Sequence, residues 1–570
     1  MPTVVRTGAD AFVPDAVVYD STNFGFRYTG FRDFDRFLAQ TTGTDTGMIG
    51  WPGGYFAEDR PELYGYDFEG LSNPDGFIPP LSDMIALANA QGAGLSITLP
   101  TMAWLDDPEA IRPLVRDFMS DLLDGTWGEL PDRFVIELGA EYYAHLSHGE
   151  YSTEEAAPLY GRLASVMIEE ITAALEDPDV NLLDQDVQIG IQAGRTDDCS
   201  CRIIDAMSPE ALAEIDLLIV SRMPAFFSGV DSGMADVETT LETWDESILD
   251  AGGGTPGLFF TSFNVASPTR TEVADRFIAD KLEAGVVLAR DDLGLDDRTN
   301  AEFEQYWQDT LGRYALGLDQ PRVLAELFSE YSALGLEGGT AFGVDQIHPG
   351  RLSFVDAEGA PVSFLGMDFL QMLYPSVDGT RMLDVSLEND ASDPYDVYAF
   401  EGEEHTTIFV MGDNHSQSVT LDIEGLSSNF TSVYVDTLTP EVPEDWMTRY
   451  GIPDHPDIDE SAEAETYAES VRGTQTPVVD GDQMTVQIET PGQILRIVLT
   501  HSALGEEEVS DWVFNPSAAL VLHADDPDGE PPADDPDPPE DDVTTSLGGD
   551  GGIGAALLLL LPLLALAGMG

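Results

Sequence analysis

Short apolar strands alternate with amphipathic helices over the first two thirds of the chain, and this alternation is the strongest constraint on the fold. Eight apolar segments bounded by turn residues are expected to be strands: residues 16–24, 48–51, 95–99, 134–138, 187–192, 215–220, 258–263 and 340–344. Between them lie segments with helical spacing, among them 81–90, 110–123, 154–175, 301–315 and 322–334. Because neighbouring parallel strands need helical crossovers, the sequence predicts an α/β fold, a (β/α)8 TIM barrel over residues 15–355.

After about residue 360 the hydrophobic period changes from that of a helix to that of a strand. Alternating or apolar segments between turn signals are expected at 396–400, 406–411, 418–423, 432–436, 484–488 and 493–499. They predict an antiparallel β-sandwich domain over residues 360–505. An acidic stretch, residues 440–470, interrupts the pattern and is expected to be a surface loop.

The C-terminal segment has a different composition from the body of the chain. Residues 524–550 are rich in Asp, Glu, Pro and Gly, which predicts a disordered, extended stalk. Residues 553–569 are an uncharged apolar run that resembles the sorting or anchoring tails of bacterial surface proteins. No N-terminal signal peptide is visible. We therefore expect an extracellular or cell-surface protein whose tail provides attachment to a membrane.

Charge excludes one large class of function. The chain has 24 Lys+Arg against 106 Asp+Glu, a formal net charge of −82, and such a surface cannot neutralise a phosphate backbone. We therefore expect no nucleic-acid partner. An acidic surface with Lys281 as its single lysine suits solubility in strong salt, typical of a marine or halophilic source. The two cysteines, Cys199 and Cys201, are interpreted as loop thiols, and no metal-ligand cluster or cofactor motif stands out.

Glu141 is the first candidate for catalysis. Active sites of such barrels lie at the carboxyl ends of the strands, and Glu141 comes just after the fourth predicted strand, followed by Tyr142 and Tyr143. A carboxylic acid there could protonate a glycosidic oxygen, and aromatic rings stack on the apolar faces of sugars. The alternative is that Glu141 only caps the loop or helix that follows.

Two further segments add candidate residues for sugar binding. Trp51 and Tyr55 flank a Pro-Gly-Gly turn after the second strand, where backbone can approach a ligand closely. The segment Gly257–Pro268 ends the seventh strand. The alternative for the Trp51 segment is a tight turn with buried aromatic side chains.

Together these motifs resemble the large clan of retaining (β/α)8 glycoside hydrolases, particularly its α-L-arabinofuranosidase, β-xylosidase and heparanase-like families. In those families a strand-two R-[YW]-P-G-G, a strand-four G-N-E and a strand-seven T-E-W-N recur, and here the corresponding segments are Gly50–Gly54, Gly139–Glu141 and Thr261–Asn264. Residues 366–385 and 490–500 resemble the accessory domain that follows those barrels. The resemblance implies a retaining glycosidase fold with Glu141 as general acid/base.

The chain also departs from that pattern. Ser262 stands where the resemblance places the carboxylate nucleophile, Ala140 where it places a sugar-binding Asn, and Gly50 where it places an Arg. After the sixth strand, Arg222 and Met223 stand where His and aromatic residues are expected. A serine hydroxyl without an adjacent base is a poor nucleophile toward an acetal carbon.

Two hypotheses follow. In the first, the protein cleaves glycosidic bonds of a polysaccharide, with Glu141 as acid and Asp345, after the eighth strand, as base for an inverting displacement. In the second, it is a catalytically inactive carbohydrate-binding or surface protein. Both hypotheses make carbohydrate the partner, and both place the substrate-binding residues at the strand ends: Trp51, Tyr55, Tyr142, Tyr143, Arg222, Ser262, Phe263 and Asn264. For Asp345 the alternative is a residue that anchors a loop.

Overall fold

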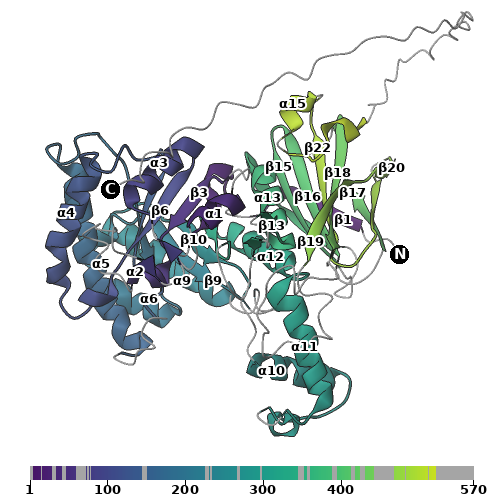
Figure 1. Ribbon diagram of the computed structural model, residues 1–570, viewed down its shortest axis with the longest axis horizontal. Coiled ribbons are helices and arrows are strands. Elements are labelled where there is room, and N and C mark those ends of the chain that lie inside the picture. The colour runs from purple at the N-terminus through teal and green to yellow at the C-terminus, as the bar shows by residue number, and fades with distance from the viewer. Residues whose placement is uncertain are drawn as a thin grey trace, which may run out of the picture. The chain divides into compact units, whose positions relative to one another are not determined.

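The computed structural model contains a barrel and a β-sandwich (Figure 1). It describes residues 4–13, 16–28, 34–41, 46–58, 72–73, 76–77, 79–143, 151–224, 230, 234–265, 270–295, 298–344, 352–355, 360–387, 395–412, 417–423, 430–441, 468–481, 483–502, 504–510 and 512–521. All of these lie in one compact unit, Met1–Leu522. The predicted stalk and apolar tail, residues 524–550 and 553–569, lie outside the described residues.

The barrel is closed by eight parallel strands, which confirms the predicted fold class. Its strands, in chain order, are β2 (Phe24–Arg27), β3 (Met48–Trp51), β6 (Gly94–Leu99), β7 (Phe134–Leu138), β8 (Gln188–Gln192), β9 (Leu217–Arg222), β10 (Gly257–Phe263) and β11 (Leu336–Ala341). The first strand was predicted too early, at 16–24. The Asp20 side chain accepts a hydrogen bond from the Thr22 amide and caps a 3-10 turn at Ser21–Asn23, so the strand begins only at Phe24.

The helices that lie between these strands in the sequence are α1 (Phe34–Thr41), α2 (Gly54–Glu58), α3 (Leu81–Gln91), α4 (Arg112–Leu123), α5 (Thr153–Glu176), α6 (Asp197–Ile204), α7 (Pro209–Leu212), α9 (Met234–Ala251), α10 (Arg270–Glu283), α11 (Ala301–Leu316) and α12 (Gln320–Ser332). Helices α10 and α11 contact each other and share a small apolar cluster of their own, with Phe277 and Phe303 in contact.

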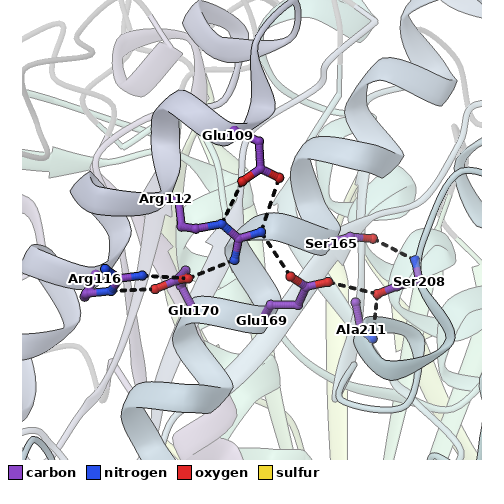
Figure 2. A network of polar contacts seen from close by, with 8 residues as sticks. All are labelled: Glu109, Arg112, Arg116, Ser165, Glu169, Glu170, Ser208 and Ala211. Carbon is purple, nitrogen blue, oxygen red and sulfur yellow. Dashed lines mark hydrogen bonds and ion pairs between the residues drawn. The ribbon is translucent and has the colours of Figure 1, made fainter.

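An ion-pair network ties α4 to α5 on the outside of the barrel (Figure 2). Arg112 Nη1 donates to Glu170 Oε1 at 2.8 Å, and Arg116 Nε donates to Glu170 Oε2 at 2.9 Å. The Ser208 hydroxyl donates to Glu169 at 3.3 Å and so extends the network toward α7. These contacts hold two neighbouring helices together at a distance from the strand ends.

The barrel interior has an apolar layer and a polar layer. Met48, Val135, Leu217, Ile219 and Phe259 form one buried cluster inside the strands. Because side chains two residues apart on a strand share a face, Glu137 and Thr261 lie in the next layer, toward the carboxyl ends. There the buried Glu137 pairs with the buried Arg27, and the hydroxyls of Ser96, Thr98 and Thr261 donate to its two oxygens.

The second sheet system is a β-sandwich, as predicted, with additions at its edges. Its strands are β1 (Val4–Phe12), β14 (Thr380–Leu387), β15 (Tyr395–Gly402), β16 (His405–Gly412), β17 (Gln417–Asp422), β18 (Ser432–Glu441), β19 (Glu469–Thr474), β20 (Val478–Asp480), β21 (Gln483–Ile488), β22 (Ile494–Thr500) and β23 (Leu520–Val521). The N-terminal strand β1 was not predicted. It pairs antiparallel with β14 and parallel with β17, so the chain starts in the sandwich before it enters the barrel (Figure 1).

Helix α13 (Leu365–Val377) falls inside the range predicted for the sandwich and packs between α12 and strand β18. It is buried along most of its length. Strand β19 begins at the end of the acidic stretch that was predicted to be a surface loop, while residues 442–467 of that stretch lie outside the described residues. No helix in the described part of the chain is long and apolar enough to cross a membrane.

Candidate active site

Glu141 lies three residues beyond the end of β7 in an uncommon backbone conformation. Its φ is 41°, in the left-handed region, where few side chains other than glycine, asparagine and aspartate are found. Gly139 next to it has a φ of 76°, which a glycine adopts without strain. A strained residue persists only where its surroundings determine its conformation, and such positions cluster at functional sites.

Three successive amides of this segment donate to three different elements. Gly139 N donates to Leu99 O at the end of β6 at 2.8 Å. Ala140 N donates to Glu58 Oε1 of α2 at 3.0 Å, and Glu141 N donates to Gln192 Oε1 of β8 at 3.3 Å. The segment is therefore fixed by the strands on both sides of β7 and by the short helix after β3.

The setting of the Glu141 carboxyl group favours its protonated form. Burial raises the pKa of Glu141, while the charge of Arg195 and hydrogen bonds from Ser221 and Tyr143 oppose that rise. Arg195 also lies over the Tyr143 ring, at 5.1 Å from its centroid. A carboxyl group with a raised pKa can hold a proton at a higher pH than an exposed glutamate, as a general acid requires.

An irregularity in β10 directs Ser262 toward the side of the strand that faces Glu141. Phe260 pairs with Val220 of β9, but Ser262 pairs with Ser221, so Thr261 is an extra residue in β10. Phe260 and Phe263 stack at 5.3 Å on the outer side of the strand. Ser262 therefore lies opposite Ser221, which takes part in the hydrogen bonding of Glu141.

Glycine at position 50 leaves room for an arginine from the neighbouring strand. A Cβ atom at Gly50 would lie 3.0 Å from Nε of Arg27 and 2.9 Å from Oγ1 of Thr340. Arg27 Nη1 donates to Pro52 O at 3.1 Å, and its Nε donates to Thr261 O at 2.6 Å. Arg27 thus joins the turn after β3 to the end of β10 from inside the barrel.

The structure buries several of the residues predicted to bind sugar. Trp51 and Phe263 are each 1% exposed, and Tyr142 and Asn264 are 0% exposed. Tyr142 stacks on Tyr160, with ring centroids 5.0 Å apart. For Trp51 this fits the alternative of a tight turn with buried aromatic side chains, and for all four the predicted contact with sugar stays a prediction.

The remaining predicted residues divide into three groups. Tyr143, Ser262 and Arg222 are half-buried; burial raises the pKa of Tyr331 to about 12, and the charge of Arg222 opposes that rise. Tyr55 belongs to α2, and its side chain lies outside the described part of the structure. Asp345 also lies outside the described residues, so its proposed role as base stays a prediction.

Four residues that the sequence interpretation did not single out complete the surroundings of Glu141. They are Glu58, Gln192, Arg195 and Ser221. Arg195 is an exposed residue shortly after β8, and the rule of examining the residues after each strand would have identified it. Glu58 follows Tyr55 by three residues and Ser221 precedes Arg222, but their contacts depend on the folded structure. Among the described residues, no group of His, Cys, Asp and Glu is placed to hold a metal ion.

No protein-family model matches the sequence, and no curated protein sequence matches it either. Solved structures of α-L-arabinofuranosidases do match. A family 51 enzyme from Bifidobacterium longum superposes with a TM-score of 0.55 at 10% identity, covering 87% of this chain and 99% of that one. The chain shares the fold of these arabinofuranosidases.

Two further structures agree with that match. The family 51 arabinofuranosidase from Xanthomonas axonopodis pv. citri has a TM-score of 0.53 at 12% identity, covering 87% of this chain and 100% of that chain. The α-L-arabinofuranosidase from Thermotoga maritima has a TM-score of 0.53 at 11% identity, with the same coverage. The resemblance seen in the sequence is thus confirmed at the level of fold, a barrel followed by a sandwich.

Proposed function

We propose that this protein is glycoside-hydrolase-like and acts on a polysaccharide, with Glu141 as its general acid/base. The observation that carries the proposal is the setting of Glu141. It is a strained, partly exposed carboxyl group at the carboxyl end of a barrel strand, and burial raises its pKa. The likeness to arabinofuranosidases supports a carbohydrate substrate, and furanosides of arabinose are the first to test.

The reaction needs a second group besides the acid. Protonation of the glycosidic oxygen by Glu141 lets the leaving sugar depart, while a water or a carboxylate attacks the anomeric carbon. With Ser262 at the end of β10, an inverting displacement is favoured, in which a base such as Asp345 takes a proton from the attacking water.

A second candidate function is carbohydrate binding without catalysis. The observation that favours it is electrostatic. Burial raises the pKa of Glu141, and the charge that opposes this rise is the cation Arg195. A guanidinium, two serine hydroxyls and a phenol can bind the hydroxyl groups of a sugar without cleaving it.

Hydrolysis of 4-nitrophenyl α-L-arabinofuranoside detects activity, and hydrolysis of methyl α-L-arabinofuranoside, whose alkoxide leaving group needs a proton, tests Glu141 as the acid. Glu141→Gln should lower kcat by about 10²- to 10⁴-fold, because it removes the proton donor and keeps the shape. The exposed Glu154 at the start of α5 provides the control Glu154→Gln, which should leave kcat unchanged. Full activity in Glu141→Gln would exclude this residue as the acid.

Binding to arabinoxylan separates the two candidates. If the wild-type chain cleaves nothing but is retarded in a gel containing arabinoxylan, and Tyr143→Ala abolishes that retardation, the binding function is supported. Absence of both cleavage and retardation with a panel of neutral polysaccharides would contradict both candidates.

The proposal extends to location. The apolar run at residues 553–569 supports a surface-attached protein, with residues 524–550 as an extended spacer. Fractionation of cells that express the full chain should place it with the envelope, and removal of residues 553–569 should release it. Recovery of the intact full chain only from the cytosol would contradict this part of the proposal.

A further inference from the structure

We propose that Glu58 is a positioning residue that holds the backbone of Glu141 in its left-handed conformation. This inference rests on the proposed role of Glu141 as general acid/base. It concerns how the chain keeps a strained residue in place at the end of β7. Glu58 itself, at the end of α2, is buried and has no place in the proposed reaction.

The Glu58 carboxylate is surrounded by donors. Its Oε2 accepts from Thr101 N at 2.7 Å and from Met102 N at 2.9 Å. Its Oε1 accepts from Thr101 Oγ1 at 2.8 Å and from Ala140 N at 3.0 Å. Four donors on two oxygens fill the hydrogen-bonding capacity of an ionised carboxylate. Three of them come from the segment after β6, and the fourth comes from the segment that carries Glu141.

Close packing leaves little room for these groups to move apart. A Cβ atom at Gly139 would lie 2.5 Å from Thr101 Oγ1 and 2.9 Å from Glu58 Oε1, so only glycine fits there. On the other side of the segment, Gly54 of α2 faces Ala140, where an added Cβ would come within 2.2 Å of the Ala140 Cβ atom. Helix α2 therefore contacts residues 139 and 140 through both its first and its last residue.

The far side of the segment is held by α5 and β8. The Tyr160 hydroxyl donates to Leu138 O at 2.6 Å and accepts from Gln192 N at 3.0 Å. The Gln192 side-chain oxygen in turn accepts a hydrogen bond from the Glu141 amide. Glu58 is the only charged side chain among the acceptors that hold the amides of residues 139–141 in the described structure. Charge-assisted hydrogen bonds are stronger than neutral ones, so Glu58 is the acceptor whose loss should matter most.

Hydrogen exchange measured by mass spectrometry tests the inference without reference to activity. In Glu58→Gln the single side-chain oxygen keeps the most partners when it faces Thr101 N and Met102 N, because the side-chain NH2 can then donate to the Thr101 hydroxyl, and the Ala140 amide is the one that loses its acceptor. We expect the Ala140 amide, followed in a peptide that covers residues 134–143, to exchange at least about tenfold faster than in wild type. Unchanged exchange in that peptide would overturn the inference.

Glu170 provides a matched control, because it is also a poorly exposed carboxylate with several donors, in the network between α4 and α5 (Figure 2). Glu170→Gln should leave exchange in residues 134–143 unchanged. If Glu58→Gln does not fold, Thr101→Val removes only the hydroxyl donor at 2.8 Å and should give a smaller acceleration in the same peptide. No acceleration in Thr101→Val would then count against the inference.

The kinetic measurement separates a positioning role from a purely structural one. A carboxyl group displaced by about 1 Å loses about 10²-fold in rate, so Glu58→Gln should lower kcat with little change in KM. It should also move the alkaline limb of the pH profile to lower pH, because Glu141 must be protonated to act as the acid and a loosened Glu141 gains solvent, which lowers its pKa. Normal kcat and an unchanged profile in Glu58→Gln would refute the positioning role.

The two measurements fail independently. Faster exchange in Glu58→Gln, together with a wild-type chain that cleaves no aryl glycoside, would support the backbone contact and refute hydrolysis as the function. Active wild-type protein with unchanged exchange in Glu58→Gln would support hydrolysis as the function and refute the backbone contact.

Discussion

The interior of the barrel and the interior of the sandwich are built from different chemistry. Inside the barrel, Arg27 and Glu137 form an ion pair that is 1% and 0% exposed, surrounded by serine and threonine hydroxyls. Between the two layers of the sandwich the core is apolar, and Leu495, Ile497 and Leu499 of β22 belong to it. The buried ion pair of the sandwich, Arg496 with Asp436, lies on the opposite face of the sheet.

That opposite face is covered by α13. Arg496 Nη1 donates to Met372 O at 3.2 Å and to Ser376 Oγ at 2.9 Å, and both acceptors belong to this helix. Charged groups are therefore buried where elements must meet in one particular register, and the sandwich core needs none. In the barrel the polar layer lies directly below the strand ends that carry Glu141 and Ser262. Its hydrogen bonds join β2, β6, β7 and β10, and so they fix the frame of the candidate site.

Breaking the ion pair between Arg27 and Glu137 inside the barrel should have the largest effect on the free energy of unfolding. Arg27→Met leaves the Glu137 carboxylate buried without its cation, which should lower the free energy of unfolding by about 3–5 kcal/mol. Denaturant titration followed by circular dichroism measures the loss. The double variant Arg27→Met with Glu137→Leu removes both charges and should recover much of it. A loss below about 1 kcal/mol in the single variant would mean that water reaches the pair.

Shortening a large apolar side chain in the sandwich core should lower the free energy of unfolding by somewhat less. Ile497 is 0% exposed and lies between the two layers of the sandwich. Ile497→Ala should lower the free energy of unfolding by about 2–5 kcal/mol, and the conservative Ile497→Val by about 0.5–1.5 kcal/mol. Neither variant should change the hydrogen exchange of residues 134–143. Faster exchange there would show that the sandwich core also determines the geometry of the candidate site.

Much of the fold could be predicted because its periodicity is local. Strand β7 was predicted with its observed bounds, since Phe134–Leu138 is an apolar run between turn residues. Strand β1 could not be predicted in the same way, because its partners β14 and β17 are more than 350 residues away in sequence. The first barrel strand was misplaced because apolar residues at 16–19 resemble a strand, while the Asp20 cap determines where it starts.

The candidate site was only partly predictable. Position after a strand identified Glu141, and motif comparison identified Ser262, but neither indicates which side chains hold them. The contact between Glu58 and Ala140 joins residues 82 positions apart in sequence. The inward direction of Ser262 depends on the extra residue in β10, and no pattern in the sequence predicts that extra residue. The aromatic residues were taken as exposed platforms, yet Trp51 and Tyr142 pack in the core, as large apolar rings usually do.

The smallest expected effect concerns pH and the outer face of the sandwich, where His405 sits. Its ring Nε2 lies 3.0 Å from Ser376 O, so the neutral ring donates there, and its ring stacks on Trp512 with centroids 4.1 Å apart. Burial lowers the pKa of His405 below its usual value of 6.5. Below pH 6.5 the His405 ring binds a proton in the unfolded chain but stays neutral in the folded chain. The folded state is therefore destabilised as pH falls from 6.5 toward the folded pKa of His405.

The many carboxylates of this chain also titrate as pH falls, so a difference between two proteins isolates the histidine. Denaturation midpoints of wild type and His405→Gln should differ most near pH 8 and converge by about pH 5, because glutamine keeps an N–H donor and does not titrate. A difference that stays constant with pH would show that the folded ring binds its proton as readily as the unfolded chain does, as when water solvates it. That result would place the pH-sensitive contact of the sandwich elsewhere.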